Sequence, residues 1–245
     1  MFRRILIANR GEIAIRIARA AQGLGIETMA LHGQDDGRSL HVLAADRALA
    51  LPGSGVAAYL DQEAVIAAAL AGDCDAIHPG YGFLAENAGF ARRCAEAGLA
   101  FIGPAPETLA LFGDKLAARR LAEEAGVPVI EGTTRATGLS CAAAFMAKLG
   151  PGVPVMVKAA AGGGGRGMRV VKDPADLAEA YARCASEAKS AFGDETLFIE
   201  RFIPAARHIE IQILGDGTGA VSHLFERDCS LQRRRQIGGR RPAPA

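Results

Sequence analysis

A lysine that precedes a run of glycines is the part of this sequence best suited to chemistry. Lys158 is followed by glycines at positions 162–165, and then by Arg166 and Gly167. Glycine lets a ligand approach backbone N–H groups closely, and the lysine and arginine add positive charge at the same place. Together these residues predict a cradle for a polyphosphate. The alternative is a surface hairpin that binds nothing.

The order of these residues differs from that of the common nucleotide loops. The lysine precedes the glycines and no Ser or Thr follows them, so the loop is not a P-loop. The stretches 155–158 and 168–172 both have the composition of short β-strands. We therefore expect a glycine flap between two strands of a hairpin, rather than the strand-to-helix turn of a dinucleotide fold.

Three further polar residues are candidates for the same site. Lys115 begins a predicted helix, and a second lysine would help to neutralise a triphosphate. Glu200 ends a predicted strand and could meet an adenine edge or a ribose. His208 begins an alternating stretch that places polar side chains on one strand face and isoleucines on the other. Each residue also has a structural alternative: a solvated lysine, an exposed strand end, or the polar side of a half-buried strand.

Polar residues also follow two predicted strands near the N-terminus. The stretch 78–87 comes after one of these strands, at the place where open α/β sheets bind ligands. Within it, Glu86 and Asn87 could instead be helix caps. The turn after the first strand, residues 9–12, holds a single glycine and lacks a dinucleotide fingerprint.

Composition excludes several classes of function. The chain has 245 residues, a net charge of +1, 5% aromatic residues and no tryptophan, which argues against nucleic-acid binding. No stretch is long and apolar enough to span a membrane. The five scattered cysteines lack a metal-ligand spacing and are typical of a reducing compartment. We expect a cytoplasmic protein.

The predicted elements divide the chain into two domains. Strands at 4–8, 26–31, 48–51, 75–78 and 100–102 alternate with helices at 12–24, 61–70 and 86–97, which predicts a parallel α/β sheet covered on both faces and ending near Gly113. Asp114 is a good N-cap for a helix that runs to Ala125. The stretch 133–140 is loop-like. The rest predicts antiparallel α+β structure, with a helix at 174–192, strands at 196–202, 208–214 and 220–225, and a hairpin turn at 215–219.

These segments, taken in order, resemble the biotin carboxylase family, the ATP-grasp component of biotin-dependent carboxylases such as acetyl-CoA carboxylase. The matching stretches are residues 7–14, 78–87, 101–104, 113–115, the glycine flap, 207–212 and 226–234. The resemblance implies a Rossmann-like pre-ATP-grasp domain over 1–113. It also implies a partial ATP-grasp domain over 114–245, with a mobile lid at about 130–203.

The resemblance implies an ATP-dependent ligase that carboxylates biotin with bicarbonate through carboxyphosphate. It further implies Mg²⁺ or Mn²⁺, a biotin carboxyl carrier protein or domain, a carboxyltransferase component, a homodimer, and in one branch fatty acid biosynthesis. Gln232 matches a residue near biotin. The residues that match the ATP site of the family are Lys115, Lys158, Gly162, Gly163, Gly164, Gly165, Gly167, Met168, Glu200, Arg201 and His208.

The sequence departs from the family near its end. Ile237 stands where the family has a bicarbonate-binding lysine, and an isoleucine has no charge to offer. Members of the family also continue with magnesium-binding glutamates and a catalytic arginine, which have no counterpart here. We therefore expect a truncated enzyme without turnover of its own. The alternatives are a non-catalytic module that binds a nucleotide or a partner, and an ATP-grasp ligase that acts on a different acid.

Overall fold

The computed structural model describes residues 2–161, 167–233, 236–237 and 241–242. The chain forms two compact units, Met1–Gly113 and Asp114–Ala245, and each is described by itself. Within the described residues, no helix is long and apolar enough to cross a membrane.

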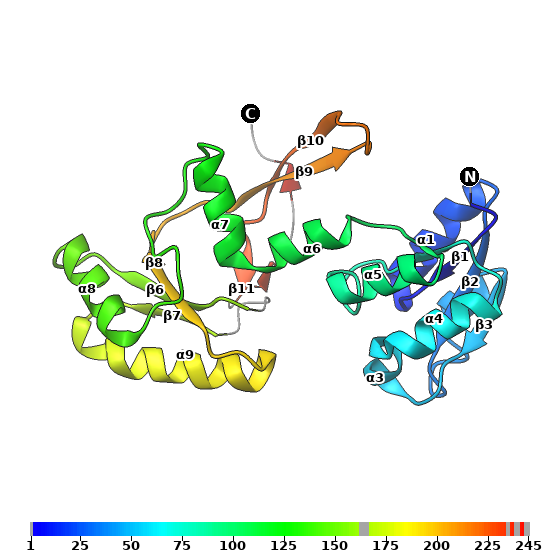
Figure 1. Cartoon of the computed structure of the whole chain (residues 1–245), viewed down its shortest axis with the longest axis horizontal. Coiled ribbons are helices and arrows are strands. Elements are labelled where there is room, and N and C mark those ends of the chain that lie inside the picture. The colour runs from blue at the N-terminus through cyan, green and yellow to red at the C-terminus, as the bar shows by residue number, and fades with distance from the viewer. Residues whose placement is uncertain (1, 162–166, 234–235, 238–240, 243–245) are drawn as a thin grey trace. The chain divides into compact units, whose positions relative to one another are not determined.

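The first unit is built around a parallel five-stranded sheet with strand order β3-β2-β1-β4-β5 (Figure 1). The sequence predicted all five strands and three of the helices; it missed α2, α3 and α6, which are short. The elements are β1 (Arg4–Ile7), α1 (Gly11–Gly23), β2 (Glu27–His32), α2 (Leu40–Ala44), β3 (Arg47–Ala50), α3 (Gly55–Leu60), α4 (Gln62–Ala71), β4 (Ala76–His78), α5 (Ala88–Glu96), β5 (Ala100–Phe101) and α6 (Pro106–Gly113).

Alternation along β1 explains why both faces of this sheet are covered. Ile5 and Ile7 pack with Ile17 of α1 in one buried cluster. Leu6, between them, belongs to a second cluster with Val65 of α4. Successive side chains of a strand point to opposite faces, so the apolar run of β1 supplies two cores, as predicted.

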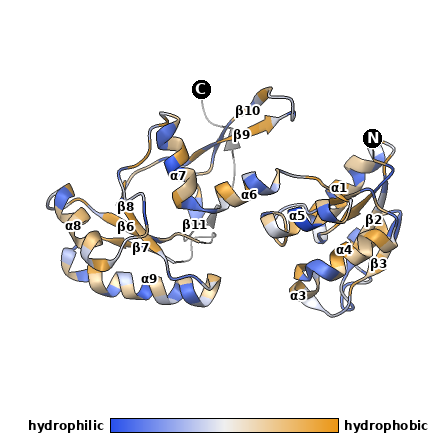
Figure 2. Cartoon of the chain, in the orientation of Figure 1, coloured by the Kyte–Doolittle hydropathy of each residue, from blue (hydrophilic) through white to orange (hydrophobic). Residues whose placement is uncertain are grey.

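The second unit begins with helices and a three-stranded antiparallel sheet of order β7-β6-β8. Helix α9 runs along this sheet in Figure 1, and its apolar and polar residues alternate along its length in Figure 2. Helix α8 is an element that the sequence did not predict. The elements are α7 (Lys115–Glu124), α8 (Leu139–Leu149), β6 (Val155–Ala159), β7 (Met168–Val171), a 3-10 turn η1 (Pro174–Asp176), α9 (Leu177–Phe192) and β8 (Leu197–Arg201).

Helices α8 and α9 cover one face of this sheet. On β6, Val155 and Val157 are buried in a cluster with Cys184 of α9 and Met146 of α8. Lys158 and Met156 alternate with these valines and belong to the opposite face. On β8, which pairs with β6, Leu197 and Ile199 join the helix-side cluster, whereas Phe198 and Glu200 alternate with them.

The remaining strands form a hairpin that corrects one expectation. Strands β9 (Ile209–Gly215) and β10 (Val221–Asp228) pair antiparallel around the predicted turn, and β13 (Arg241–Pro242) adds to β10. We expected a half-buried β9, but Ile209, Ile211 and Ile213 are 38%, 49% and 54% exposed. The alternation is present, but no described element of this unit covers the apolar side. A short pair, β11 (Gln232–Arg233) and β12 (Gln236–Ile237), follows.

Candidate functional site

A pocket of about 460 Å³ in the second unit gathers most of the polar residues singled out in the sequence. It lies where β6 and β8 meet the segment that leads into β9. Five of the predicted residues line it, namely Lys158, Glu200, Arg201, His208 and Gln232.

Lys158 is held at this pocket by two neighbours on β8. Its Nζ lies 2.8 Å from Glu200 Oε1, and both side chains are largely shielded, at 22% and 14% exposure. The same Nζ lies 5.5 Å from the centre of the Phe198 ring. A partly desolvated lysine, paired with one carboxylate over an aromatic face, is a localised positive charge suited to a phosphate.

Lys115 comes to the same end of β6 through the packing of helix α7. Asp114 caps this helix, because its Oδ1 accepts the N–H groups of Leu116 and Ala117 at 2.8 and 3.1 Å. Leu116 then packs in a small cluster with Ala160 and Phe198. Lys115 Nζ donates to the carbonyl of Ala160 at 3.4 Å, two residues beyond Lys158.

Gly167 closes the base of the glycine flap. Its carbonyl accepts the N–H of Ala159 at 2.8 Å, where β6 and β7 diverge. Its φ is +63°, and a Cβ at this position would lie 2.9 Å from the Ala159 Cβ. Both facts require a glycine. The predicted hairpin is therefore present, while Gly162, Gly163, Gly164 and Gly165 lie outside the described residues.

His208 and Gln232 form a second polar group on the pocket wall. Gln232 Nε2 lies 2.8 Å from His208 Nδ1 and also donates to the carbonyl of Cys229 at 3.1 Å. The family resemblance implies that His208 lies near ATP and Gln232 near biotin, and the structure places the two side chains in contact. The side chain of Ile237 is outside the described residues. The loss of the family's bicarbonate-binding lysine at this position therefore stays a prediction.

The pocket also has an apolar wall that the sequence did not single out. It is formed by Ile130, Met156, Phe202 and Ile203. Met156 could have been found, because it shares a strand face with Lys158. Ile130 could not, because it lies in a loop that comes beside β8 only through tertiary packing.

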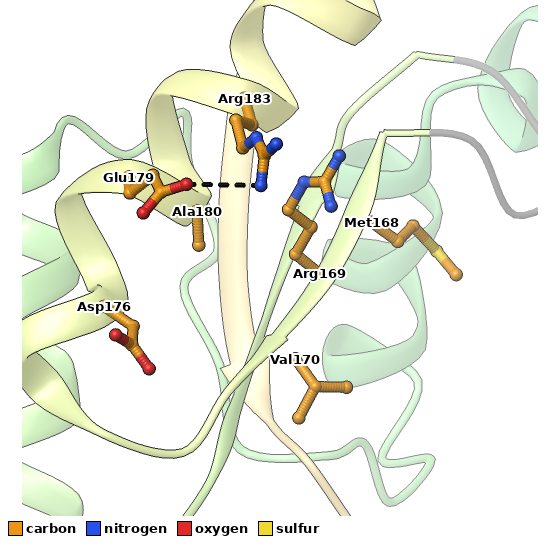
Figure 3. A pocket seen from close by; sticks show the side chains of 7 residues that line it. All are labelled: Met168, Arg169, Val170, Asp176, Glu179, Ala180 and Arg183. Carbon is orange, nitrogen blue, oxygen red and sulfur yellow. Dashed lines mark ion pairs between the residues drawn. The ribbon is translucent and has the colours of Figure 1, made fainter.

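Met168 lines a different hollow, of about 430 Å³, between β7 and α9 (Figure 3). Within its lining, Glu179 pairs with Arg183 at 3.2 Å, while Arg169 pairs with Glu187, which does not line the hollow. Since Lys158, Glu200 and His208 do not line it, this surface is not the candidate site.

The polar residues singled out in the first unit make hydrogen bonds within that unit. The Asn9 side chain donates to the carbonyls of Pro79 and Tyr81 at 2.7 and 2.9 Å. Asn87 caps α5 by accepting the Phe90 N–H at 2.8 Å, which supports the capping interpretation of that residue. Burial lowers the pKa of His78, whose Nδ1 accepts the Gly80 N–H.

A parallel α/β unit followed by an antiparallel unit with a lysine-bearing strand and a glycine flap defines an ATP-grasp type of protein. Comparison with known families agrees. Residues 1–109 match the model of the biotin carboxylase N-terminal domain, and residues 114–243 match that of the carbamoyl-phosphate synthase L chain ATP-binding domain. The chain belongs to the biotin carboxylase family, a family of ATP-dependent ligases.

Curated relatives include pyruvate carboxylase from Bacillus subtilis, 51% identical over 95% of this chain and 20% of that protein. Biotin carboxylase from Nostoc is 49% identical over the whole of this chain and 55% of its own length. This chain therefore spans about half the length of the biotin carboxylase that it matches.

Solved structures give the same picture. A Campylobacter jejuni structure described as a biotin carboxylase-beta-gamma-ATP complex superposes with a TM-score of 0.94 at 44% identity, over 97% of this chain and 53% of that one. The biotin carboxylase domain dimer of Hydrogenobacter thermophilus 2-oxoglutarate carboxylase, described with MgADP, ADP and bicarbonate, gives 0.91 at 43% identity over 97% and 52%.

Proposed function

We propose that this chain supplies the nucleotide-binding half of a biotin carboxylase. The observation that supports this most directly is the pocket that combines Lys158, Glu200 and His208 at the base of the glycine flap. Lysine charge would hold the phosphates, and the apolar wall would take the base. The glycines, including the undescribed ones, would fold over the phosphates and exclude water.

The reaction of the enzyme to which this half would belong is the carboxylation of biotin by bicarbonate. A bicarbonate oxygen attacks the γ-phosphorus of ATP, the bond to the β-phosphate oxygen breaks, and ADP leaves with carboxyphosphate formed. Carboxyphosphate then splits into CO₂ and phosphate. The ureido nitrogen of biotin attacks CO₂, and phosphate takes the nitrogen's proton. Such a reaction depends on positioning and charge neutralisation.

A divalent cation would enter this site with the nucleotide. The described residues contain no group of three or more His, Cys, Asp or Glu side chains arranged to hold a metal ion. Since Mg²⁺ is commonly held by substrate phosphates with one or two carboxylates, we assign no metal ligand to this chain.

Nucleotide binding is tested by calorimetry with ADP on the wild-type chain, Lys158→Ala and Lys189→Ala. Lys189 is the matched control, because it also pairs with a glutamate, Glu195 at 3.1 Å, but at an exposed site on α9. We expect wild-type protein and Lys189→Ala to bind alike and Lys158→Ala to bind at least tenfold more weakly, the equivalent of about 1.4 kcal/mol. Equal binding by all three would refute the assignment.

Turnover is a separate part of the proposal. Because Ile237 cannot supply the charge that the family lysine gives to bicarbonate, we expect this chain to bind ATP without bicarbonate-dependent hydrolysis. Bicarbonate-dependent phosphate release that disappears in Lys158→Ala would contradict this expectation.

The exposed apolar side of β9 favours a second function, that of a module which works with another carboxylase polypeptide. Its isoleucines are about half exposed, and large apolar patches commonly mark interaction sites. The test adds a polypeptide equivalent to the second half of a biotin carboxylase and measures its association with this chain by analytical ultracentrifugation, with Ile211→Glu as the disrupting variant. Absence of association with wild-type chain, or equal association with Ile211→Glu, would refute this role.

The partners and the final acceptor also belong to the proposal. Biotin would arrive on a carboxyl carrier protein or domain, a carboxyltransferase component would choose the acceptor, and the assembly would be a cytoplasmic homodimer. This chain is similar to both a biotin carboxylase and a pyruvate carboxylase. The earlier expectation of acetyl-CoA carboxylase and fatty acid synthesis therefore gains no specific support.

A further inference from the structure

The segment after β10 holds His208 by its backbone as well as by its side chain. The N–H of His208 donates to Ser230 Oγ at 2.9 Å, and its carbonyl accepts the Cys229 N–H at 2.7 Å. The side chain meets Gln232 Nε2 at 2.8 Å. One short segment therefore controls both where His208 sits and which way its ring faces.

These contacts determine the tautomer of the neutral ring. Gln232 Nε2 also donates to the Cys229 carbonyl at 3.1 Å. This second bond fixes the amide orientation, because the opposite orientation would set two carbonyl oxygens against each other. Gln232 is then the donor to Nδ1, so the imidazole carries its proton on Nε2. The pair thus offers a ligand one hydrogen-bond donor, the imidazole Nε2–H, and one acceptor, the amide oxygen of Gln232.

Asp228 fixes the serine on which this arrangement depends. Its Oδ1 accepts the Ser230 N–H at 2.9 Å, and its Oδ2 accepts from the Arg207 guanidinium at 3.2 Å. The Ser230 hydroxyl, the Ser230 N–H and Arg207 lower the pKa of Asp228 to about 2, so the carboxylate is charged at neutral pH. Asp228 holds Ser230 through its backbone N–H, and the Ser230 hydroxyl in turn accepts the His208 N–H.

We propose that Asp228, acting through Ser230, is the positioning residue that sets His208 and Gln232 for the nucleotide. This inference rests on the proposed nucleotide site. Asp228 itself does not line the pocket, whereas Arg207, His208, Ser230 and Gln232 do. Its action is therefore indirect, through the place and tautomer of the histidine.

The same hairpin contains a matched control at its other end. Asp216 accepts the Thr218 N–H at 2.8 Å, the Thr218 hydroxyl at 2.7 Å and the Ala220 N–H at 3.1 Å. Its pKa is lowered by the same kinds of hydrogen bond, with the threonine hydroxyl first. Asp216 and Asp228 are thus similar caps on one hairpin, and only Asp228 adjoins the pocket residues.

The experiment measures the tautomer of His208 and the affinity for ADP in the full chain. Long-range ¹⁵N–¹H spectra report the imidazole tautomer, and His208→Gln identifies the signal among the five histidines. In Asp228→Asn and Ser230→Ala we expect loss of the single Nε2–H tautomer and about tenfold weaker ADP binding, the scale of one hydrogen bond. Ser230→Thr keeps the hydroxyl and should restore both. Asp216→Asn should change neither.

The outcomes separate this inference from the proposed function. If Asp228→Asn and Ser230→Ala keep the wild-type tautomer, or if Asp216→Asn disturbs it equally, the positioning role is wrong whatever the affinity. If the wild-type chain fails to bind ADP while these variants lose the tautomer, the proposed function is wrong and the positioning contact stands.

Discussion

Gly132 gives the sharpest test of how the candidate site is built. The segment that contains it runs beside β8 and bridges to Glu200. The Thr133 N–H donates to the Ile199 carbonyl, and the Arg201 N–H donates to the Glu131 carbonyl, both at 2.8 Å. This strap holds the strand that carries the carboxylate partner of Lys158.

Alanine at Gly132 should force the strap away from β8. The new Cβ would lie 2.9 Å from both the Ile199 oxygen and the Glu200 Cβ. Neither neighbour can rotate away, because one belongs to the backbone and the other is attached directly to it. Overpacking of this kind costs about 1–3 kcal/mol, which corresponds to roughly 5- to 150-fold faster exchange of amides that open with the strap.

The assay is amide hydrogen exchange by NMR at Thr133 and Arg201, with ADP affinity measured alongside. Gly215→Ala is the control, since a Cβ there meets nothing within 4 Å and its φ is not in the positive range. We expect faster exchange and weaker ADP binding for Gly132→Ala only. Unchanged exchange at both amides would refute the argument that the close approach of the strap sets the position of Glu200.

Three further perturbations have expected outcomes. Leu197→Ala should lower the free energy of unfolding in urea by about 2–5 kcal/mol, because this side chain is 1% exposed. Leu214, at 53% exposed, is the control, and Leu214→Ala should change the free energy of unfolding by no more than about 0.5 kcal/mol. Equal losses of stability would contradict the difference in burial. Asp114→Ala should cost about 1 kcal/mol through loss of the α7 cap, and unfolding midpoints identical to those of wild type would show that the cap is unimportant. Burial lowers the pKa of His78 in the folded chain below its ordinary value of 6.5, so the unfolded chain takes up the proton first. The unfolding free energy should therefore fall as pH drops below about 6.5. Urea titrations of His78→Gln should lack that decrease, and persistence of the full decrease would exclude His78 as its source.

Much of the fold could be predicted because local pattern and tertiary environment agree. The apolar runs of β1 and β4 fit a sheet covered on both sides, and Asp114 caps its helix as its position predicts. The glycine flap was placed correctly between paired strands. Helix α8 was missed because it begins after Gly138 with no side-chain cap, so no local signal marks its start. The burial of β9 was wrong because alternation reports which side is apolar and says nothing of what covers it.

The candidate site shows the same division. Lys158 and Glu200 were found from their chemistry, since a lysine beside a glycine run and a carboxylate at a strand end are visible locally. Ile130 and Asp228 were not singled out. Their importance comes from contacts between residues far apart in the sequence. Ile130 lines the pocket with Lys158, and Asp228 accepts hydrogen bonds from Arg207 and from the N–H of Ser230, which contacts His208.

The sequence by itself determined the family, the two units and the chemical character of the phosphate cradle, because residue type and short-range spacing encode charge, turn geometry and strand alternation. Only the tertiary structure decided that Gln232 meets His208 and that Lys158 pairs with Glu200. Those pairings depend on which strand lies beside which and in what register. Register is set by the packing of the whole sheet, and no local pattern of residues specifies it.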